Sequence, residues 1–318
     1  MRIAVLDDYQ NVALTVADWS RLPVQCSIDV FNTPIEPAHA ARALAPYDII
    51  CTLRERMKIP GELIRTLPNL KYIVVTGRRY DSIDVETAAQ LGIPVSNTEV
   101  RGGGGVAELV WGLILACARN ISFEDRMMRS GGWQNSIGMT LRGRTLGLLG
   151  FGNLGQQVAT IGHAFGMKII AWSPNLTAER AQQGGATFVS KAELFRQSDV
   201  LSLHLVLGPK TWGIVRAEEL RTMKPTAYLI NTARGPLIDE MALIEALQTK
   251  TIAGAGLDVF DQEPLPDEHP LRHLDNALLT PHLGYYTREM VGSYYEDAII
   301  AIDAFFKGSP VNLVNARQ

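Results

Sequence analysis

Short apolar runs of three to five residues alternate with helical patterns from the first residue of the chain. In the first hundred residues we expect strands at 3–6, 28–31, 49–52, 72–76 and 94–96. Apolar residues in helical spacing lie between them, for example at 60–67 and 85–91. Strands that alternate with helices indicate βαβ units, so this part predicts one open α/β domain with a parallel sheet.

A second series of strands and helices follows. Its expected strands are 145–149, 168–172, 200–205, 228–231, 254–258 and 278–280. The last helix, 288–306, ends at Lys307-Gly308, a cation followed by glycine that is typical of a helix end. Because it comes after the second sheet, it can cross back and pack on the first domain. We therefore expect two domains, 1–101 with 286–318 and 102–285.

Composition and charge narrow the class of protein. The chain has 318 residues, which is long for one core, and it is 47% hydrophobic and 20% charged, as in ordinary soluble globular proteins. A net charge of −3 argues against a nucleic-acid partner. The N-terminus has the pattern of a strand rather than a signal peptide, and the apolar run 106–118 is too short to span a bilayer. We expect a cytoplasmic protein without a membrane partner.

The three cysteines, Cys26, Cys51 and Cys117, are widely spaced and form no Cys-x-x-Cys pair. This disfavours a disulfide framework and a zinc site, and we expect no metal. Each lies among apolar neighbours, so we expect small buried side chains.

A glycine-rich turn follows the first strand of the second series. Gly150, Gly152 and Gly155 form G-x-G-x-x-G, and Asn153 and Leu154 begin a helical pattern. Glycines at this place permit a tight turn and let a pyrophosphate approach the helix N-terminus. A ligand-free turn is the alternative, but the strand–turn–helix context favours a dinucleotide site.

The residue that would choose between NAD and NADP is missing. An acid about 20 residues further on usually binds the ribose hydroxyls of NAD, but strand 168–172 ends in Ser173-Pro174-Asn175. No arginine follows at once to accept the 2′-phosphate of NADP, and Arg180 is the nearest. The choice of cofactor stays open.

Arg234, Glu263 and His282 each follow a predicted strand. Imidazole suits proton transfer near neutral pH, and a neighbouring carboxylate would orient it and favour its protonated form. A guanidinium would hold a substrate carboxylate and polarise a carbonyl oxygen. Taken alone, the arginine could equally form a surface ion pair, the glutamate could be a solvated loop acid, and the histidine could cap a helix. No spacing rule selects His282 over His39, His163, His204, His269 and His273; His204, within 201–205, is more typical of a hydrogen-bonded core group than of a base.

Taken together, these motifs resemble the D-isomer-specific 2-hydroxyacid dehydrogenase family, which includes phosphoglycerate dehydrogenase and glyoxylate/hydroxypyruvate reductase. The likeness covers nearly the whole chain. The matching segments are 148–155, 223–225 with 230–235, 254–260 with 263–264, and 280–284.

The resemblance implies a fold, a reaction and roles for particular residues. It implies two Rossmann- or flavodoxin-like domains with parallel sheets, the active site in the cleft between them, and a homodimer. The domain 1–101 with 286–318 would bind substrate and 102–285 would bind the dinucleotide. His282 would be the acid/base, Glu263 its partner and Arg234 the cation for substrate. The expected cofactor contacts are Gly150, Gly152, Asn153, Leu154, Gly155, Ser173, Pro174, Asn175, His204, Thr232, Ala233 and Asp258, the last toward the nicotinamide amide. The expected substrate contacts are Thr76, Gly77, Arg78 and Arg234.

Two segments depart from the family pattern. The family's Gly-x-Gly-x-Asp-Asn-Ile-Asp loop, whose backbone N–H groups hold the substrate carboxylate, is here 77–84 with Arg79 at the second glycine position. Arg78 and Arg79 are either solvated or add charge to the substrate pocket and favour a larger or doubly anionic acid. The second departure is the run Gly102–Gly105, either a hinge or a loop that cradles an anion, and we favour the linker.

The sequence therefore predicts an NAD(P)-dependent oxidoreductase that transfers a hydride between nicotinamide and C2 of a small 2-keto or D-2-hydroxy acid. Formate dehydrogenase chemistry is disfavoured, because those enzymes carry Gln where this chain has Glu263. A dinucleotide-sensing protein of the corepressor type on the same fold is the alternative from another class.

Overall fold

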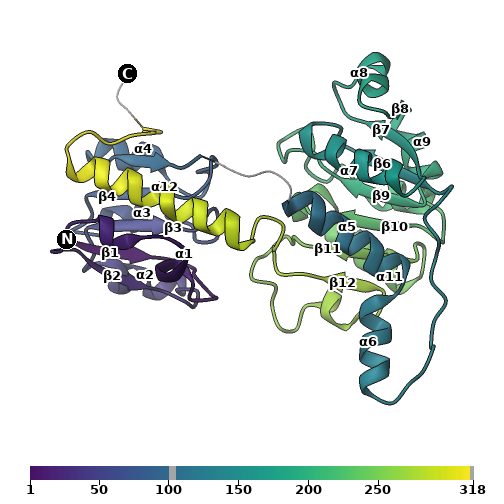
Figure 1. Cartoon of the computed structure of the whole chain (residues 1–318), viewed down its shortest axis with the longest axis horizontal. Helices are drawn as coiled ribbons and strands as arrows, with labels where there is room; N and C mark the ends of the chain where they lie inside the picture. The colour runs from purple at the N-terminus through teal and green to yellow at the C-terminus, as the bar shows by residue number, and fades with distance from the viewer. Residues whose placement is uncertain (100–104, 316–318) are drawn as a thin grey trace. The chain divides into compact units, whose positions relative to one another are not determined.

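The chain folds into two compact α/β units, shown in the computed structural model of Figure 1. The structure describes residues 1–99 and 105–315. The first unit comprises Met1–Gly103 with Thr287–Gln318, and the second Gly104–Tyr286. Both are built on parallel sheets with helices, which confirms the fold class expected from the alternating pattern. Of the glycine run, 102–104 lies outside the described residues.

The first unit is a five-stranded parallel sheet in the order β2-β1-β3-β4-β5. Its strands are β1 (Arg2–Val5), β2 (Ser27–Val30), β3 (Ile49–Thr52), β4 (Tyr72–Val75) and β5 (Val95–Asn97). Its helices are α1 (Ala13–Val16), α2 (Pro37–Leu44), α3 (Gly61–Arg65), α4 (Val85–Gln90) and α12 (Arg288–Phe306), with a 3₁₀ turn at Trp19–Arg21. The chain leaves β1 toward β2 on one side and returns to β3 on the other, so the strand order reverses between β1 and β3.

Helix α12 belongs to the first unit, although the second unit precedes it in the sequence. Figure 1 shows it lying along the sheet of that unit. The fully buried Tyr72 of β4 stacks on Phe305 with ring centroids 4.4 Å apart, and its hydroxyl donates to the Ala301 carbonyl at 3.3 Å. The helix ends where the sequence indicates, with Gly308 at φ +73°.

The second unit is a seven-stranded parallel sheet in the order β12-β11-β10-β9-β6-β7-β8. Its strands are β6 (Thr145–Leu149), β7 (Lys168–Trp172), β8 (Thr187–Phe188), β9 (Val200–Leu203), β10 (Tyr228–Asn231), β11 (Gly254–Leu257) and β12 (Ala277–Leu279). Its helices are α5 (Gly105–Ala118), α6 (Ile121–Arg129), α7 (Asn153–Ala164), α8 (Ala178–Gln183), α9 (Lys191–Gln197), α10 (Ala217–Thr222) and α11 (Glu240–Gln248), with 3₁₀ turns at Gly235–Leu237 and Pro270–His273.

Helices cover both faces of this sheet, which is why its strands are apolar runs rather than alternating ones. Successive residues of a strand enter different cores: Leu148 packs with the helices α5 and α7, whereas Leu149 packs with α9, α10 and α11. The same alternation separates Val200 from Leu201. Two cores on opposite faces hold the sheet rigid, so the loops at its carboxyl edge start from fixed positions.

The structure differs from the expected elements mainly by additions. Strands 49–52, 145–149, 168–172 and 228–231 and helix 288–306 have the expected bounds. The two-residue strand β8 and several short helices carry too few apolar residues to stand out as periodic patterns. Cys51 and Cys117 are buried, as expected, but Cys26 is only partly buried because it lies in the turn before β2.

The assignment of α12 to the first core predicts unequal effects for two neighbouring isoleucines. Ile299 is fully buried, whereas Ile300 is 39% exposed. Ile299→Ala should lower the free energy of unfolding of the first unit by about 2–5 kcal/mol because it leaves a cavity. Ile300→Ala is the matched control and should cost less than about 1 kcal/mol. Urea titration followed by circular dichroism, with hydrogen exchange of β1 and β4, measures both; equal effects would contradict the packing.

Candidate functional site

The glycine turn after β6 lies where the strand order of the second sheet reverses. The chain passes from β6 to β7 on one side and later to β9 on the other. Gly150 has φ +108°, and a Cβ there would come within 2.6 Å of the carbonyl carbon of His204, just after β9. A Cβ on Gly155 would lie 2.5 Å from the Gly150 carbonyl oxygen. Only glycine fits either position, and open α/β sheets bind their ligands at such a reversal.

Helix α7 begins in this turn with its first backbone groups exposed to a ligand. Gly152 is its N-cap and so offers no side-chain cap, and a Cβ there would meet no atom within 4 Å. Asn153, Leu154 and Gly155 form the first helical residues. Their N–H groups and the open space before them are what a pyrophosphate needs.

The neutral segment after β7 supports the turn directly. The Ser173 hydroxyl accepts a hydrogen bond from the Phe151 N–H at 2.9 Å. Pro174 and Asn175 follow and are exposed. The first residue after β7, where an acid would bind the ribose, is therefore Ser173, whose hydroxyl fixes the glycine turn.

Two buried polar side chains near this edge have no hydrogen-bond partner among the described residues. They are the Thr232 hydroxyl, after β10, and both ring nitrogens of His204, after β9. The expectation of a hydrogen-bonded core histidine is thus wrong. Burial lowers the pKa of His204 to about 4, so the ring is neutral at pH 7. With the glycine turn, these groups fit a bound dinucleotide, because a buried polar group without a partner is costly until a ligand supplies one.

The segment that carries Arg234 is shaped by its neighbours. The Asn231 side chain accepts from the Ala233 N–H at 3.0 Å and donates to the Arg234 carbonyl at 2.9 Å. The backbone of Phe260 and Asp261 packs directly on Gly235, and a Cβ there would lie 2.5 Å from the Asp261 nitrogen. The loop with Arg234 and the loop leading to Glu263 are therefore in contact.

Glu263 and His282 form a hydrogen-bonded pair. Glu263 Oε2 lies 2.6 Å from His282 Nδ1, and Glu263 Oε1 accepts from the Phe260 N–H at 2.9 Å. The carboxylate assigns the Nδ1 proton to the histidine, which leaves Nε2 for a ligand. The ring also meets Tyr285 edge to face at 5.3 Å.

A buried carboxylate fixes the backbone around His282. Asp258 Oδ1 accepts from the Thr280 hydroxyl at 2.6 Å and the Leu283 N–H at 2.7 Å, and Oδ2 accepts from the Gly284 N–H at 2.9 Å. His282 itself has φ +54°, a conformation uncommon outside glycine. Burial raises the pKa of Asp258, opposed by these three donors and the nearby imidazole. Asp258, expected to contact a nicotinamide amide, is thus seen to hold the turn that carries His282.

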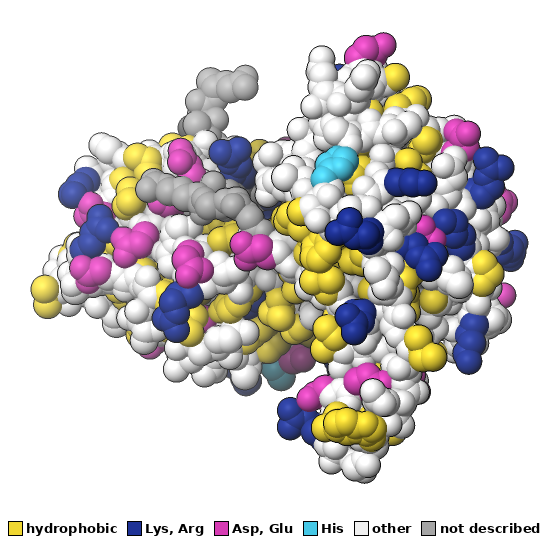
Figure 2. Space-filling model, turned by 45° about the vertical axis from the view of Figure 1, so that its right-hand side comes forward, with side chains coloured by type: hydrophobic (Ala, Val, Ile, Leu, Met, Phe, Trp, Pro, Cys, Tyr) yellow, Lys and Arg dark blue, Asp and Glu magenta, His cyan; other side chains and the backbone are white. Residues whose placement is uncertain are grey.

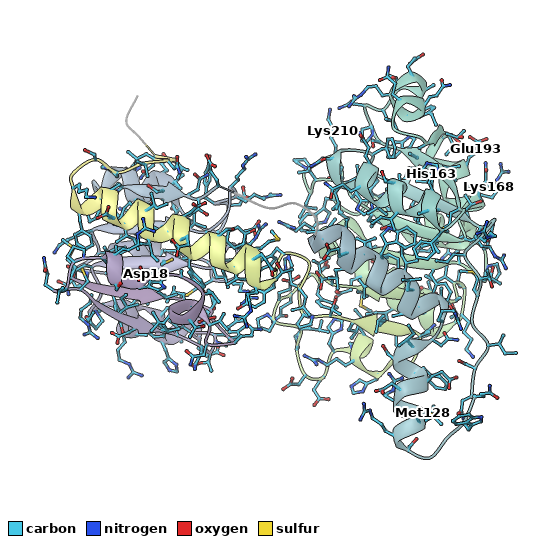
Figure 3. The ribbon with its side chains drawn as sticks, in the orientation of Figure 1. Asp18, Met128, His163, Lys168, Glu193 and Lys210 are labelled. Carbon is cyan, nitrogen blue, oxygen red and sulfur yellow. The ribbon has the colours of Figure 1, made fainter. Side chains whose placement is uncertain are left out.

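Two other histidines of the second unit differ from His282 in their contacts. His269 Nε2 lies 3.0 Å from Glu240 Oε1, but its Nδ1 accepts from the Leu271 N–H, so both ring nitrogens are engaged. His163, labelled on α7 in Figure 3, has its Nε2 bonded to the Gly185 carbonyl at 2.8 Å. His269 thus has both ring nitrogens bonded, and His163 bonds a backbone carbonyl rather than a carboxylate.

The expected substrate contacts of the first unit lie after β4, beside an arginine that the sequence reasoning did not single out. The buried Thr76 hydroxyl accepts from the Arg54 N–H at 3.0 Å. Gly77 has φ +86°, and a Cβ there would lie 3.3 Å from Arg54 Nη1. That Nη1 donates to the Tyr294 hydroxyl at 2.8 Å. The charged run Arg54-Glu-Arg56 directly after an apolar strand was the available signal.

The two arginines of the loop 77–84 have different surroundings. Arg79 Nε donates to Asp81 Oδ2 at 2.7 Å and lies 3.4 Å from Glu55 Oε1. Arg78 is exposed and has no ion-pair partner among the described residues. The charge of Arg79 is therefore balanced, whereas that of Arg78 is not.

Other surface features lie away from these residues. A cavity of about 280 Å³ is lined by Arg119, Glu124, Met128, Trp133, Gln134, Ser136 and Gly138, at α6 and the segment after it. Figure 2 shows hydrophobic side chains gathered on this projection, where Trp133 is 74% exposed. Within 1–99 and 105–315, no cluster of His, Cys, Asp or Glu could hold a metal ion. No single helix of those ranges is long and apolar enough to cross a membrane. The helices α5 and α6 reach the required length and composition only when taken together, and the chain bends by 61° between them.

Comparisons with known proteins give matches both in sequence and in structure. The family model for "D-isomer specific 2-hydroxyacid dehydrogenase, NAD binding domain" matches residues 111–284. A glyoxylate reductase of Thermococcus litoralis is 42% identical over 268 residues, 81% of each chain. The structure of a Vibrio cholerae O395 phosphoglycerate oxidoreductase is similar with a TM-score of 0.91 and 36% identity, over 97% of this chain and 99% of that one. An acyclic imino acid reductase solved with NADPH and D-Arg has a TM-score of 0.71 and 31% identity, over 99% and 100% of the chains.

The buried neutral His204 predicts a loss of stability in mild acid. Its pKa is about 4 in the folded chain and about 6.5 in the unfolded chain, so between these values only the unfolded chain binds the proton. The free energy of unfolding should therefore fall by up to about 3 kcal/mol from this group between pH 7 and pH 4. His204→Asn should flatten the pH dependence, and His39→Asn, an exposed control, should not. Urea titrations at each pH measure this; equal slopes for all three proteins would contradict it.

Proposed function

The chain belongs to the D-isomer specific 2-hydroxyacid dehydrogenase family, and from that premise we propose that it transfers a hydride between a nicotinamide dinucleotide and C2 of a small 2-keto or D-2-hydroxy acid. The similarity to a glyoxylate reductase and a hydroxypyruvate reductase supports short acids such as glyoxylate and hydroxypyruvate as the substrates of this chain. The observation that carries the proposal is the Glu263–His282 pair, whose Oε2 and Nδ1 atoms lie 2.6 Å apart. Both residues follow strands of the same parallel sheet whose strand β6 leads into the glycine turn.

His282 is the group that moves the proton. Reduction of a 2-keto acid places negative charge on the carbonyl oxygen, which must then be protonated. With Nδ1 bonded to Glu263, Nε2 of the imidazolium would donate that proton, and in the oxidative direction the neutral ring would accept it. The Glu263 carboxylate orients the ring and stabilises its charged form, and the Phe260 N–H holds the carboxylate in turn.

Arg234 binds the acid. A guanidinium presents paired donors that match a carboxylate, and one of them can also polarise the neighbouring carbonyl oxygen. Its backbone is fixed by Asn231 and by the close packing of Gly235 on the loop that leads to Glu263. The two functional groups therefore share one support.

The glycine turn, the start of α7, Thr232 and His204 would hold the dinucleotide, which supplies or accepts the hydride when bound. The protein's part would be to bind it with the backbone N–H groups at the start of α7 and with the polar groups of Thr232 and His204. A buried neutral His204 can donate or accept one hydrogen bond without placing a charge in the site.

The reaction is tested by following NADH and NADPH consumption with glyoxylate, hydroxypyruvate, pyruvate, and bulkier and dicarboxylic keto acids. We expect turnover with at least one short keto acid and a D-configured product. Tight binding of dinucleotide without turnover of any acid would instead favour the dinucleotide-sensing alternative.

Removing the imidazole should separate chemistry from binding. His282→Ala should lower kcat by about 10²- to 10⁴-fold, the usual contribution of general acid–base catalysis, and leave the dissociation constant of NADH unchanged. His273→Ala, an exposed histidine of the same unit, is the control and should keep full activity. Steady-state kinetics and fluorescence titration measure the two quantities. Full turnover by His282→Ala would refute the role proposed for it.

Charge on the loop 77–84 should tune the choice of acid. Arg78→Ala should raise KM for dicarboxylic keto acids about five- to tenfold, since a hydrogen-bonded charge contributes about 1–1.5 kcal/mol, and change KM for glyoxylate much less. Arg79→Ala should change neither by more than about twofold, because Asp81 and Glu55 already balance its charge. Unchanged KM values for Arg78→Ala across both classes of acid would mean that Arg78 is simply solvated.

A further inference from the structure

We propose that Arg180 forms a subsite for the 2′-phosphate of NADP(H), so that the chain binds NADPH more tightly than NADH. This inference rests on the proposed function and names the cofactor that the site prefers. The end of β7, which faces the adenosine ribose in folds of this kind, carries no carboxylate. An acid at that place binds the two ribose hydroxyls of NAD and repels a phosphate, so its absence removes the usual reason for rejecting NADPH.

The structure brings Arg180 back to the end of β7. Although it lies seven positions after Ser173 on the next helix, its Nη1 donates to the Asn175 carbonyl at 3.4 Å. Its backbone N–H bonds to the Thr177 hydroxyl, which caps α8 at 3.3 Å. The guanidinium is exposed and makes no ion pair among the described residues, so its charge is available to an anion.

Arg180 also lines a cavity that starts at the dinucleotide turn. This cavity, about 150 Å³, is lined by Phe151, Gln156, Leu176, Arg180, Gln183 and Gly184. Phe151 lies between the first two glycines of the turn, and its N–H is held by Ser173. The end of α8 packs closely on it: a Cβ on Gly184 would lie 2.5 Å from Phe151 Cε1. The cavity therefore joins Phe151 of the turn to Leu176, four residues after β7, and to the arginine.

The charges around the cavity favour an anion. None of its lining residues is acidic, and Arg180 is its one cation among the described residues. Glu179 is the neighbouring acid, but it does not line the cavity, and bonds to Thr177 and to its own backbone lower its pKa. A phosphate on the ribose would meet the guanidinium as a paired, charge-assisted contact, with Gln156 and Gln183 as further donors.

Binding measurements on the intact protein test this without turnover. Dissociation constants of NADPH and NADH are measured by calorimetry, and the fragments 2′,5′-ADP and 5′-AMP are compared as competitors. We expect NADPH to bind more tightly than NADH and 2′,5′-ADP to compete better than 5′-AMP. Arg180→Ala should weaken NADPH about 10- to 100-fold, the loss of one charged contact, and change NADH less than about twofold. Arg196→Ala, an exposed arginine of the neighbouring helix α9, should change neither.

A second variant tests the same site by adding a carboxylate instead of removing the arginine. Ser173→Asp should reverse the preference toward NADH, because its carboxylate can still accept from the Phe151 N–H and would repel a 2′-phosphate. Tighter binding of NADH than of NADPH by the unmodified chain would overturn the inference. So would an equal loss of both dinucleotides in Arg180→Ala. Failure to bind either dinucleotide would instead refute the proposed function.

Discussion

The candidate active site depends on one buried carboxylate. Asp258 is fully buried and would be costly there as a lone charge, which is why burial raises its pKa. Its cost is offset by three donors, and all three belong to the turn that carries His282: Thr280, Leu283 and Gly284. Within this turn His282 has φ +54°. The conformation that brings the imidazole to Glu263 is therefore braced by the Asp258 carboxylate, through its bonds to the turn.

Strand order extends this constraint to the rest of the site. β10, β11 and β12 are neighbours, and the loops after them carry Arg234, then Asp258 and Glu263, then His282. Gly235 admits the backbone of the next loop at a distance no side chain would allow. Each functional group is thus positioned by its neighbour's backbone as well as by its own strand. Packing of this kind tolerates small side-chain changes but not a substitution of the glycine.

The elements that are long or strongly apolar could be predicted from the sequence, because a strand that is buried on both faces of its sheet has a continuous run of apolar residues. The sequence placed Arg234, Glu263 and His282 after three strands, but only the resemblance to a family selected them. The pattern could not show that Asp258 braces the turn, since its three donors are a hydroxyl and two backbone N–H groups. Nor could it show that His204 lacks a partner or that Arg54 reaches Tyr294, 240 positions away. Contacts between distant segments have no periodic signature.

The carboxyl edge of the first sheet shows how charge balance can shape specificity. Arg54 and Arg79 share the acid Glu55, which lies 3.6 Å from Arg54 and 3.4 Å from Arg79, and Arg79 also pairs with Asp81 at 2.7 Å. A partly buried carboxylate between two guanidiniums offsets part of their positive charge. Arg54 is further committed by its bond to Tyr294 of α12, so the last helix fixes the side chain that lies under Gly77. In the loop 77–84, Arg78 is therefore an exposed cation without an ion-pair partner among the described residues. Under the proposed function, a second carboxylate on the acid would meet Arg78 rather than the engaged Arg54.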